Sequence, residues 1–288
     1  MRIVVDDPAM LDLVAGNASI ERLASGMEFT EGPVWRASTQ SLVFSDIPAN
    51  RLMEWRNGSV VTLRHPCGHP NGNTLDREGR LISCAHSARC VYRELDNGER
   101  VVIAQEFAGL RLNSPNDVVV KSDGSIYFTD PPFGIAKHQR ELGFSGIYRL
   151  APSGELELLH KEMEAPNGLA FSPDERTLYV DDSSSHRLHA FRVLDDGRLG
   201  DQLQVLDMRR DLAGTPDGMK VDKRGNLFVT GPGGVWVISP DFVPLGRIEL
   251  PEPPANCAWG DDGHSLYVTA RQSLYRVRCL TSGHILPG

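Results

Sequence analysis

The chain has 288 residues, of which 40% are apolar and 24% are charged, so it can bury a sizeable core and does not have the composition of a disordered protein. Acidic residues outnumber basic ones by 38 to 30, and the net charge of −8 argues against nucleic acid as a partner because phosphate binding requires a basic surface. No apolar stretch reaches the roughly 18 residues that cross a bilayer, the N-terminus has acidic residues where a signal peptide is apolar, and five cysteines, an odd number, are typical of reduced thiols in a cytoplasmic protein.

Six segments of the chain repeat one pattern. Each begins with a residue that carries a side-chain oxygen, continues as a short apolar strand and a polar turn, and ends as a second strand rich in β-branched and aromatic residues. The first residues of the six segments are, in chain order, Glu31, Asn71, Asn116, Asn167, Asp217 and Asn256. They are 40, 45, 51, 50 and 39 residues apart, and a third strand follows in most segments. A repeat of this length with three or four strands is typical of a propeller blade.

The sequence therefore predicts an all-β fold, a six-bladed β-propeller in which residues 1–288 form a single domain. The last repeat is followed by LTSGHILPG, from Leu280, which would make a poor outer strand. The segment SIERLAS, residues 19–25, precedes the first repeat. We expect it to supply the outer strand of the last blade and so to close the ring without leaving a long open edge.

The first residue of each repeat begins the strand that lines the propeller axis, so the six side-chain oxygens are expected to form a ring at one mouth of the central channel. Asn and Asp before a strand are also common turn residues, which explains any one position equally well. A turn would also accept Ser, Gly or Thr, however, and Glu31 is not a turn former. Carboxylate and amide oxygens suit a hard divalent cation: Ca²⁺ fits this ligand type best, with Zn²⁺, Mn²⁺ or Mg²⁺ as alternatives.

The chain resembles the SMP-30/gluconolactonase/LRE-like family, and in particular its bacterial gluconolactonases, in the segments EGPVW, LNSPNDVVV, SIYFTDPPFG, APNGLAF and TPDGMKVD. The similarity runs from about Glu31 to Arg278 with the motifs in family order. It implies a six-bladed propeller with one divalent cation on its axis. It also implies metal ligands at Glu31, Asn116, Asn167 and Asp217, with Asp217 as the catalytic acid or base. Related proteins often have Cys-Glu-His where this chain has Cys84-Ala85-His86, which predicts a different substrate preference here.

The second strand of each repeat returns to the same face, so residues at its end are expected near the metal. Asp130 ends the second strand of the third repeat, and His86 follows the end of that of the second, so both are candidate substrate-binding residues. Arg111 and Asn113 are two further candidates because they stand in the segment RLNSPND just before Asn116. Each has a structural alternative, because a carboxylate after a strand often caps a turn and loop residues often only pack. An insertion over residues 131–146 is expected to lie on the metal face and to act as a lid.

The expected activity is hydrolysis of sugar lactones of the gluconolactone kind to aldonic acids, a reaction of carbohydrate metabolism. A cation would polarise the carbonyl and activate a water, and Asp217 would take the proton of that water. The expected partner is a small-molecule lactone, with no nucleic acid and no membrane, and the protein is expected as a monomer or weak homo-oligomer. Two alternatives remain open. One is a lactonase for non-sugar lactones or a phosphotriesterase on the same scaffold, and the other is a non-catalytic binding propeller with a structural metal.

Overall fold

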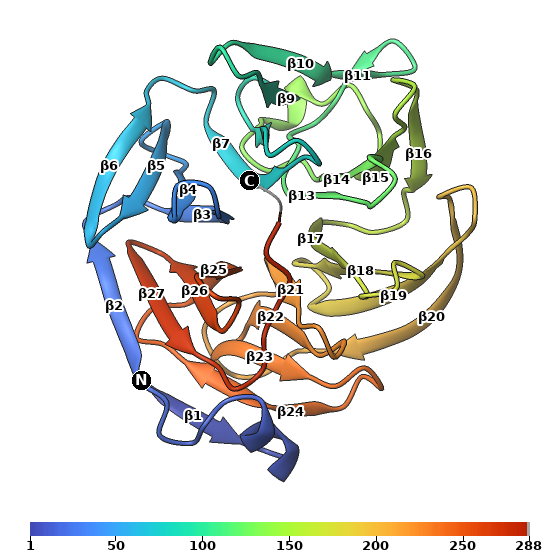
Figure 1. Cartoon of the computed structure of the whole chain (residues 1–288). Helices are drawn as coiled ribbons and strands as arrows, with labels where there is room; N and C mark the ends of the chain where they lie inside the picture. Colours follow the sequence, from blue (N-terminus) through green and yellow to red (C-terminus); the bar gives the residue numbers. More distant parts are fainter. Residues whose placement is uncertain (287–288) are drawn as a thin grey trace.

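Each repeat of the sequence folds as the inner part of an antiparallel sheet, and six such sheets surround a central axis in a computed structural model that describes residues 1–286 (Figure 1). Five of these sheets have four strands and one has five. The prediction of a six-bladed β-propeller is confirmed. The first three blades comprise β3 (Thr30–Arg36), β4 (Ser41–Asp46), β5 (Arg51–Arg56) and β6 (Ser59–Arg64), then β7 (Pro70–Leu75), β8 (Leu81–Ala85), β9 (Cys90–Glu94) and β10 (Arg100–Ala104), then β13 (Val118–Val120), β14 (Ile126–Asp130), β15 (Gly146–Leu150) and β16 (Leu156–His160).

The other three blades follow the same order from the axis outward. They comprise β17 (Pro166–Phe171), β18 (Thr177–Asp182), β19 (Arg187–Val193) and β20 (Leu199–Asp207), then β21 (Met219–Val221), β22 (Leu227–Gly231), β23 (Gly234–Ile238) and β24 (Pro244–Glu249), then β25 (Pro254–Gly260), β26 (Ser265–Ala270) and β27 (Ser273–Arg278). A small hairpin of β11 (Glu106–Phe107) and β12 (Leu110–Arg111) precedes the third blade. The short 3₁₀ helix η2 (Lys137–Gln139) lies in the insertion after β14.

The core consists of separate apolar layers between successive blades. The layer between the last and first blades, for example, joins Trp35 and Phe44 to Tyr267 and Leu274. Because every blade has a neighbour on both faces, the second strands are buried along their whole length, as in β4 and β26. This explains why these strands are nearly continuous apolar runs, whereas an outer strand such as β20 is largely exposed.

The N-terminal region completes two blades. Strand β2 (Ile20–Ser25) pairs with β27 from Ile20–Val277 to Ser25–Ser273 and forms the outer strand of the last blade. Strand β1 (Arg2–Val5) pairs with β24 as a fifth strand of the fifth blade, which the repeat pattern does not predict. Between them, η1 (Pro8–Asp12) begins where the Asp7 side chain accepts a hydrogen bond from the Ala9 N–H at 2.8 Å.

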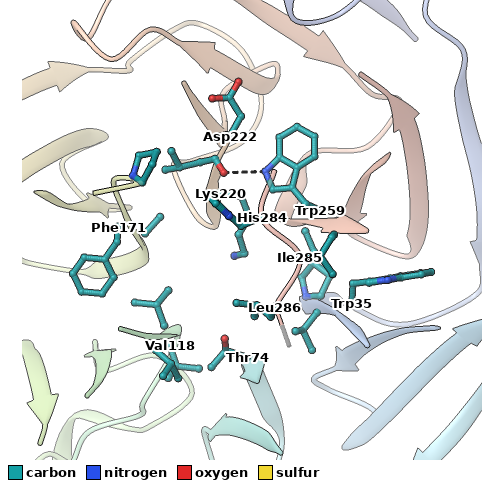
Figure 2. A pocket seen from close by; sticks show the side chains of 18 of the residues that line it. Trp35, Thr74, Val118, Phe171, Lys220, Asp222, Trp259, His284, Ile285 and Leu286 are labelled. Carbon is teal, nitrogen blue, oxygen red and sulfur yellow. Dashed lines mark hydrogen bonds between the residues drawn. The ribbon is translucent and has the colours of Figure 1, made fainter. Parts of the chain in front are cut away.

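The C-terminal segment crosses the end of the axial channel opposite the starts of the inner strands. Thr281 Oγ1 donates to Asp222 Oδ2 at 2.7 Å, and Lys223 N donates to Ser282 O at 2.9 Å. Figure 2 shows the residues that follow, from His284 to Leu286, beside Trp35 and Trp259 at a cavity of about 320 Å³. The segment is therefore not an outer strand but packs against the inner ends of several blades.

All five cysteines are buried and unpaired. None of the helices within residues 1–286 is long and apolar enough to cross a membrane.

The packing of η1 gives a stability prediction. Met10 is fully buried in the layer between the fifth and sixth blades, whereas Leu11 beside it is 45% exposed. Met10→Ala is expected to lower the free energy of unfolding by about 2–5 kcal/mol because it leaves a cavity. Leu11→Ala is the matched control and is expected to change it by less than about 0.5 kcal/mol. Urea unfolding followed by tryptophan fluorescence measures both, and equal losses would show that η1 does not contribute to the core.

Candidate active site at the mouth of the axial channel

A cavity of about 400 Å³ lies where the inner strands begin, at the end of the axis away from the C-terminal segment. It is lined by Phe29, Glu31, Ile47, Asn71, His86, Asn116, Phe133, Ala165, Asn167, Ser183, Ser184, Thr215 and Asp217. The lining thus includes all four residues predicted as metal ligands. It also includes Asn71, and the sixth ring residue, Asn256, lies directly behind Glu31 through a hydrogen bond of 3.0 Å.

Irregular pairing of the inner strands brings these side chains to the axis. The register of β3 with β4 shifts between Glu31 and Val34, and β7, β17 and β25 have the same irregularity at their ring residues. A bulge of this kind re-aims a side chain out of the regular alternation. In the third and fifth blades the ring residues, Asn116 and Asp217, stand two positions before the strand begins.

Glycine after the ring residue allows the inner strands to approach this closely. A Cβ on Gly168 would lie 2.0 Å from the Asp217 carbonyl oxygen, and one on Gly218 would lie 2.0 Å from the Asn256 amide carbon. Only glycine fits at such contacts. Four of the six ring residues are followed by glycine in the sequence, so this signal was available in the repeats.

The two ring carboxylates lie in an environment that opposes their charge. Burial, and then the nearby Asp117 carboxylate, raises the pKa of Glu31 to about 7. Burial also raises the pKa of Asp217 well above its usual range, and the Glu31, Asp181 and Asp117 carboxylates add to this rise. The Lys220 ammonium lowers the pKa of Glu31, but this effect is smaller than the others. The arrangement concentrates negative charge around the axis, and a bound cation would offset it.

The donor set fits a hard divalent cation. The ring offers carboxylate and amide oxygens, and Asn71 Oδ1 is buried without a hydrogen-bond partner. Asn167 lines the same cavity, and its Nδ2 donates to Ser183 Oγ at 2.9 Å. Within residues 1–286, no three side chains among His, Cys, Asp and Glu are grouped as metal ligands, so a cation at this ring would depend on Asn amides as well as carboxylates.

Of the four predicted substrate-binding residues, the structure brings only His86 to the cavity. Its Nε2 lies 2.9 Å from Asn71 Nδ2, and burial lowers the pKa of His86 to about 4, so the ring is neutral at pH 7 and accepts this bond through Nε2. Arg111 is exposed and donates to the Ala88 carbonyl at 3.3 Å. Asn113 and Asp130 are buried against each other outside the lining of the cavity.

Asp130 holds the chain that enters the third blade. Its two oxygens accept the N–H groups of Asn113 and Ser114, each at 2.7 Å, and Asn113 Nδ2 donates to the Phe144 carbonyl at 2.9 Å. The carboxylates at the ends of β4 and β18 do the same. Asp46 accepts the N–H groups of Glu28 and Phe29, and Asp182 accepts that of Glu164. These strand-end carboxylates therefore position the entrances of the inner strands.

The insertion over residues 131–146 forms one wall of the cavity through Phe133. Gly134 lies against the His86 ring, where a Cβ would come 3.3 Å from Nδ1. Arg89 anchors the insertion because its guanidinium donates to the carbonyls of Gln139 at 3.0 Å and Leu112 at 2.7 Å.

Sequence reasoning did not identify most of the cavity wall. The residues it missed are Phe29, Ile47, Ala165, Ser183, Ser184 and Thr215, whereas Phe133 lies in the insertion that was expected on this face. They follow second strands or precede inner strands, and their positions next to the ring residues and strand-end carboxylates were the signal available for them.

The chain is similar to known proteins over most of its length. Residues 29–272 match the model of the family described as the SMP-30/gluconolactonase/LRE-like region. A gluconolactonase from Zymomonas mobilis is 34% identical over 96% of this chain and 84% of its own length, and a 6-deoxy-6-sulfogluconolactonase from Pseudomonas putida is 28% identical over 83% and 82%. A solved gluconolactonase structure from Xanthomonas campestris has a TM-score of 0.89 at 34% identity and covers 97% of this chain and 95% of that one.

The glycine contacts can be tested directly. Gly168→Ala places a methyl group against the Asp217 backbone and is expected to cost about 1–3 kcal/mol of stability, with a lower melting temperature. Gly143→Ala is the control, since nothing lies within 4 Å of its added Cβ. Scanning calorimetry of both variants measures the difference. If the two alanines had the same effect, the close approach of the inner strands would not require glycine.

Proposed function

The chain belongs to the SMP-30/gluconolactonase/LRE-like family, and we propose that it is a metal-dependent lactonase that opens sugar lactones of the gluconolactone kind to aldonic acids. The observation that carries this proposal is the ring of oxygen-bearing side chains, two of them carboxylates with raised pKa values, at the floor of a cavity large enough for a sugar. The names of the relatives support the lactone as the substrate class.

Glu31, Asn116, Asn167 and Asp217 are the proposed metal ligands, and calcium is the preferred ion because all four offer hard oxygen donors. When bound, such a cation supplies a Lewis acid that polarises the lactone carbonyl and favours ionisation of a water molecule. Two carboxylates and two neutral amides balance the charge of a divalent ion.

Asp217 is the proposed proton acceptor of the reaction. It lines the cavity and is only half-buried, so a water above the ring can reach it. The water oxygen bonds to the carbonyl carbon of the lactone, and the bond from this carbon to the ring oxygen breaks. The proton that Asp217 takes from the water passes to the ring oxygen, which becomes a hydroxyl group of the product.

The cavity wall bears on the kind of lactone. Ser183, Ser184 and Thr215 offer hydroxyl groups on one part of the lining, which suits a polyhydroxylated substrate. The rings of Phe29 and Phe133 form an apolar part, and the lining contains no arginine among the described residues. This apolar part favours a second candidate function, hydrolysis of a less polar, non-sugar lactone at the same ring.

Metal dependence is the first test. Chelator-treated protein is expected to lose lactone hydrolysis and to regain it when calcium is added back. Glu31→Gln is expected to weaken calcium binding at least about 10-fold in isothermal titration calorimetry, since it removes one of the two formal charges. Exposed Glu28→Gln is the matched control and should bind as the unmodified protein does. Full lactonase activity in metal-free protein would contradict the proposal. Calcium binding without hydrolysis of any lactone or phosphotriester would instead support a non-catalytic propeller with a structural metal.

The role of Asp217 is the second test. Asp217→Asn keeps an oxygen and nearly the same volume but cannot accept the proton, so kcat for gluconolactone at saturating calcium is expected to fall about 10²–10⁴-fold. Asp211→Asn, at an exposed position, is the control. Turnover near that of the unmodified protein at saturating calcium would remove Asp217 as the base and leave it as a ligand only.

A further inference from the structure

The sixth ring residue, Asn256, is not among the four proposed ligands, and its side-chain amide presents its nitrogen to the ring. It is 2% exposed, and its Oδ1 accepts the N–H of Cys257 at 2.8 Å. The amide oxygen is therefore turned toward the backbone of its own strand. The amide nitrogen faces the ring instead, and Nδ2 donates to Glu31 Oε2 at 3.0 Å. An amide N–H cannot coordinate a cation.

This donor leaves one specific oxygen of Glu31 available. The Gly32 N–H also donates to Oε2, at 2.5 Å, so Oε2 receives two hydrogen bonds. The other oxygen, Oε1, then remains available to bind a cation on the axis. A hydrogen bond from a neutral donor to a carboxylate is a strong one and fixes the orientation of the group.

Asn256 also contacts a second carboxylate. Its Nδ2 donates to Asp117 Oδ2 at 3.5 Å as well as to Glu31 Oε2, so one amide group links the two carboxylates. The same residue contacts the preceding blade, because the backbone of Gly218 lies against its amide group, where no side chain would fit. Gly218 follows the proposed ligand Asp217 in the chain.

We propose that Asn256 is a positioning residue that acts through Glu31: its amide N–H holds Oε2 of the Glu31 carboxylate and so fixes the orientation in which Oε1 meets the cation, which sets the affinity of the ring for its cation. This inference rests on the proposed function, since it assumes that the ring binds a divalent cation. It divides the six ring residues by role, with Asn256 a donor to a ligand and not a ligand.

A double-mutant cycle tests the proposal. Asn256→Leu removes both polar groups at nearly constant volume, and Glu31→Gln removes the carboxylate to which Asn256 donates. The dissociation constant for calcium is measured by isothermal titration calorimetry for the unmodified protein, both single variants and the double variant. Asn256→Leu alone is expected to raise it about 10–100-fold, as loss of a group that supports a ligand does. In the Glu31→Gln background the same change is expected to raise it less than about threefold, because the effect passes through Glu31.

The possible outcomes are distinct. If Asn256 were itself a ligand or only a packing residue, its loss would have the same effect in both backgrounds, and this result would overturn the proposal. An unchanged dissociation constant in Asn256→Leu would overturn it as well. Asn256→Ala provides the same cycle without adding volume near Gly218 if the leucine variant does not fold, and melting temperatures verify that all proteins are folded. If the unmodified protein bound no divalent cation, the proposed function would fall and this inference with it, whereas binding without coupling would overturn the inference alone.

Discussion

The close approach of six inner strands at one axis is the constraint on which this molecule depends. Neighbouring inner strands lie so close that a Cβ on Gly168 would overlap the Asp217 carbonyl oxygen. Glycine is therefore required next to the ring residue at such contacts. The same geometry gathers one oxygen-bearing side chain from each blade. The apolar core lies between the blades, in layers such as that around Trp35 and Tyr267. Because this packing stabilises the fold away from the axis, the polar groups at the axis can be held together.

The gathered carboxylates are unfavourable by themselves. Burial and mutual repulsion raise the pKa of Glu31 and of Asp217, and a folded protein accepts such strain mostly where function requires it. A divalent cation would relieve it and would place a Lewis acid at the floor of the cavity. Membership of the SMP-30/gluconolactonase/LRE-like family and the lactonase names of its relatives agree with that chemistry. Within the ring, Asn256 donates a hydrogen bond to the Glu31 carboxylate, so one ring residue contacts another directly.

The carboxylates at the ends of the second strands differ from those of the ring, because they bind backbone groups and do not line the cavity. Asp46, Asp130 and Asp182 lie near the ring in the repeat pattern and carry carboxylates as Glu31 and Asp217 do, yet each accepts backbone N–H groups from the segment that enters its own blade. Their bonds are local to one blade. The ring residues, by contrast, meet side chains from other blades, as Asn71 does with Asn116.

The sequence alone determined the number of blades, the residue of each blade that stands at the axis, and the strand that completes the last blade, because all of these follow from one repeat and from the period of two along a strand. The four proposed ligands were predicted from the same repeat and from the resemblance to the family. Only the tertiary structure decided the rest: that β1 adds a fifth strand, that Arg111, Asn113 and Asp130 lie outside the cavity lining, and that Asn256 turns its nitrogen to the ring. A repeat pattern places a residue in its blade, but the direction of its side chain depends on which groups of neighbouring blades meet it across the axis, and these contacts join residues as far apart as Glu31 and Asn256.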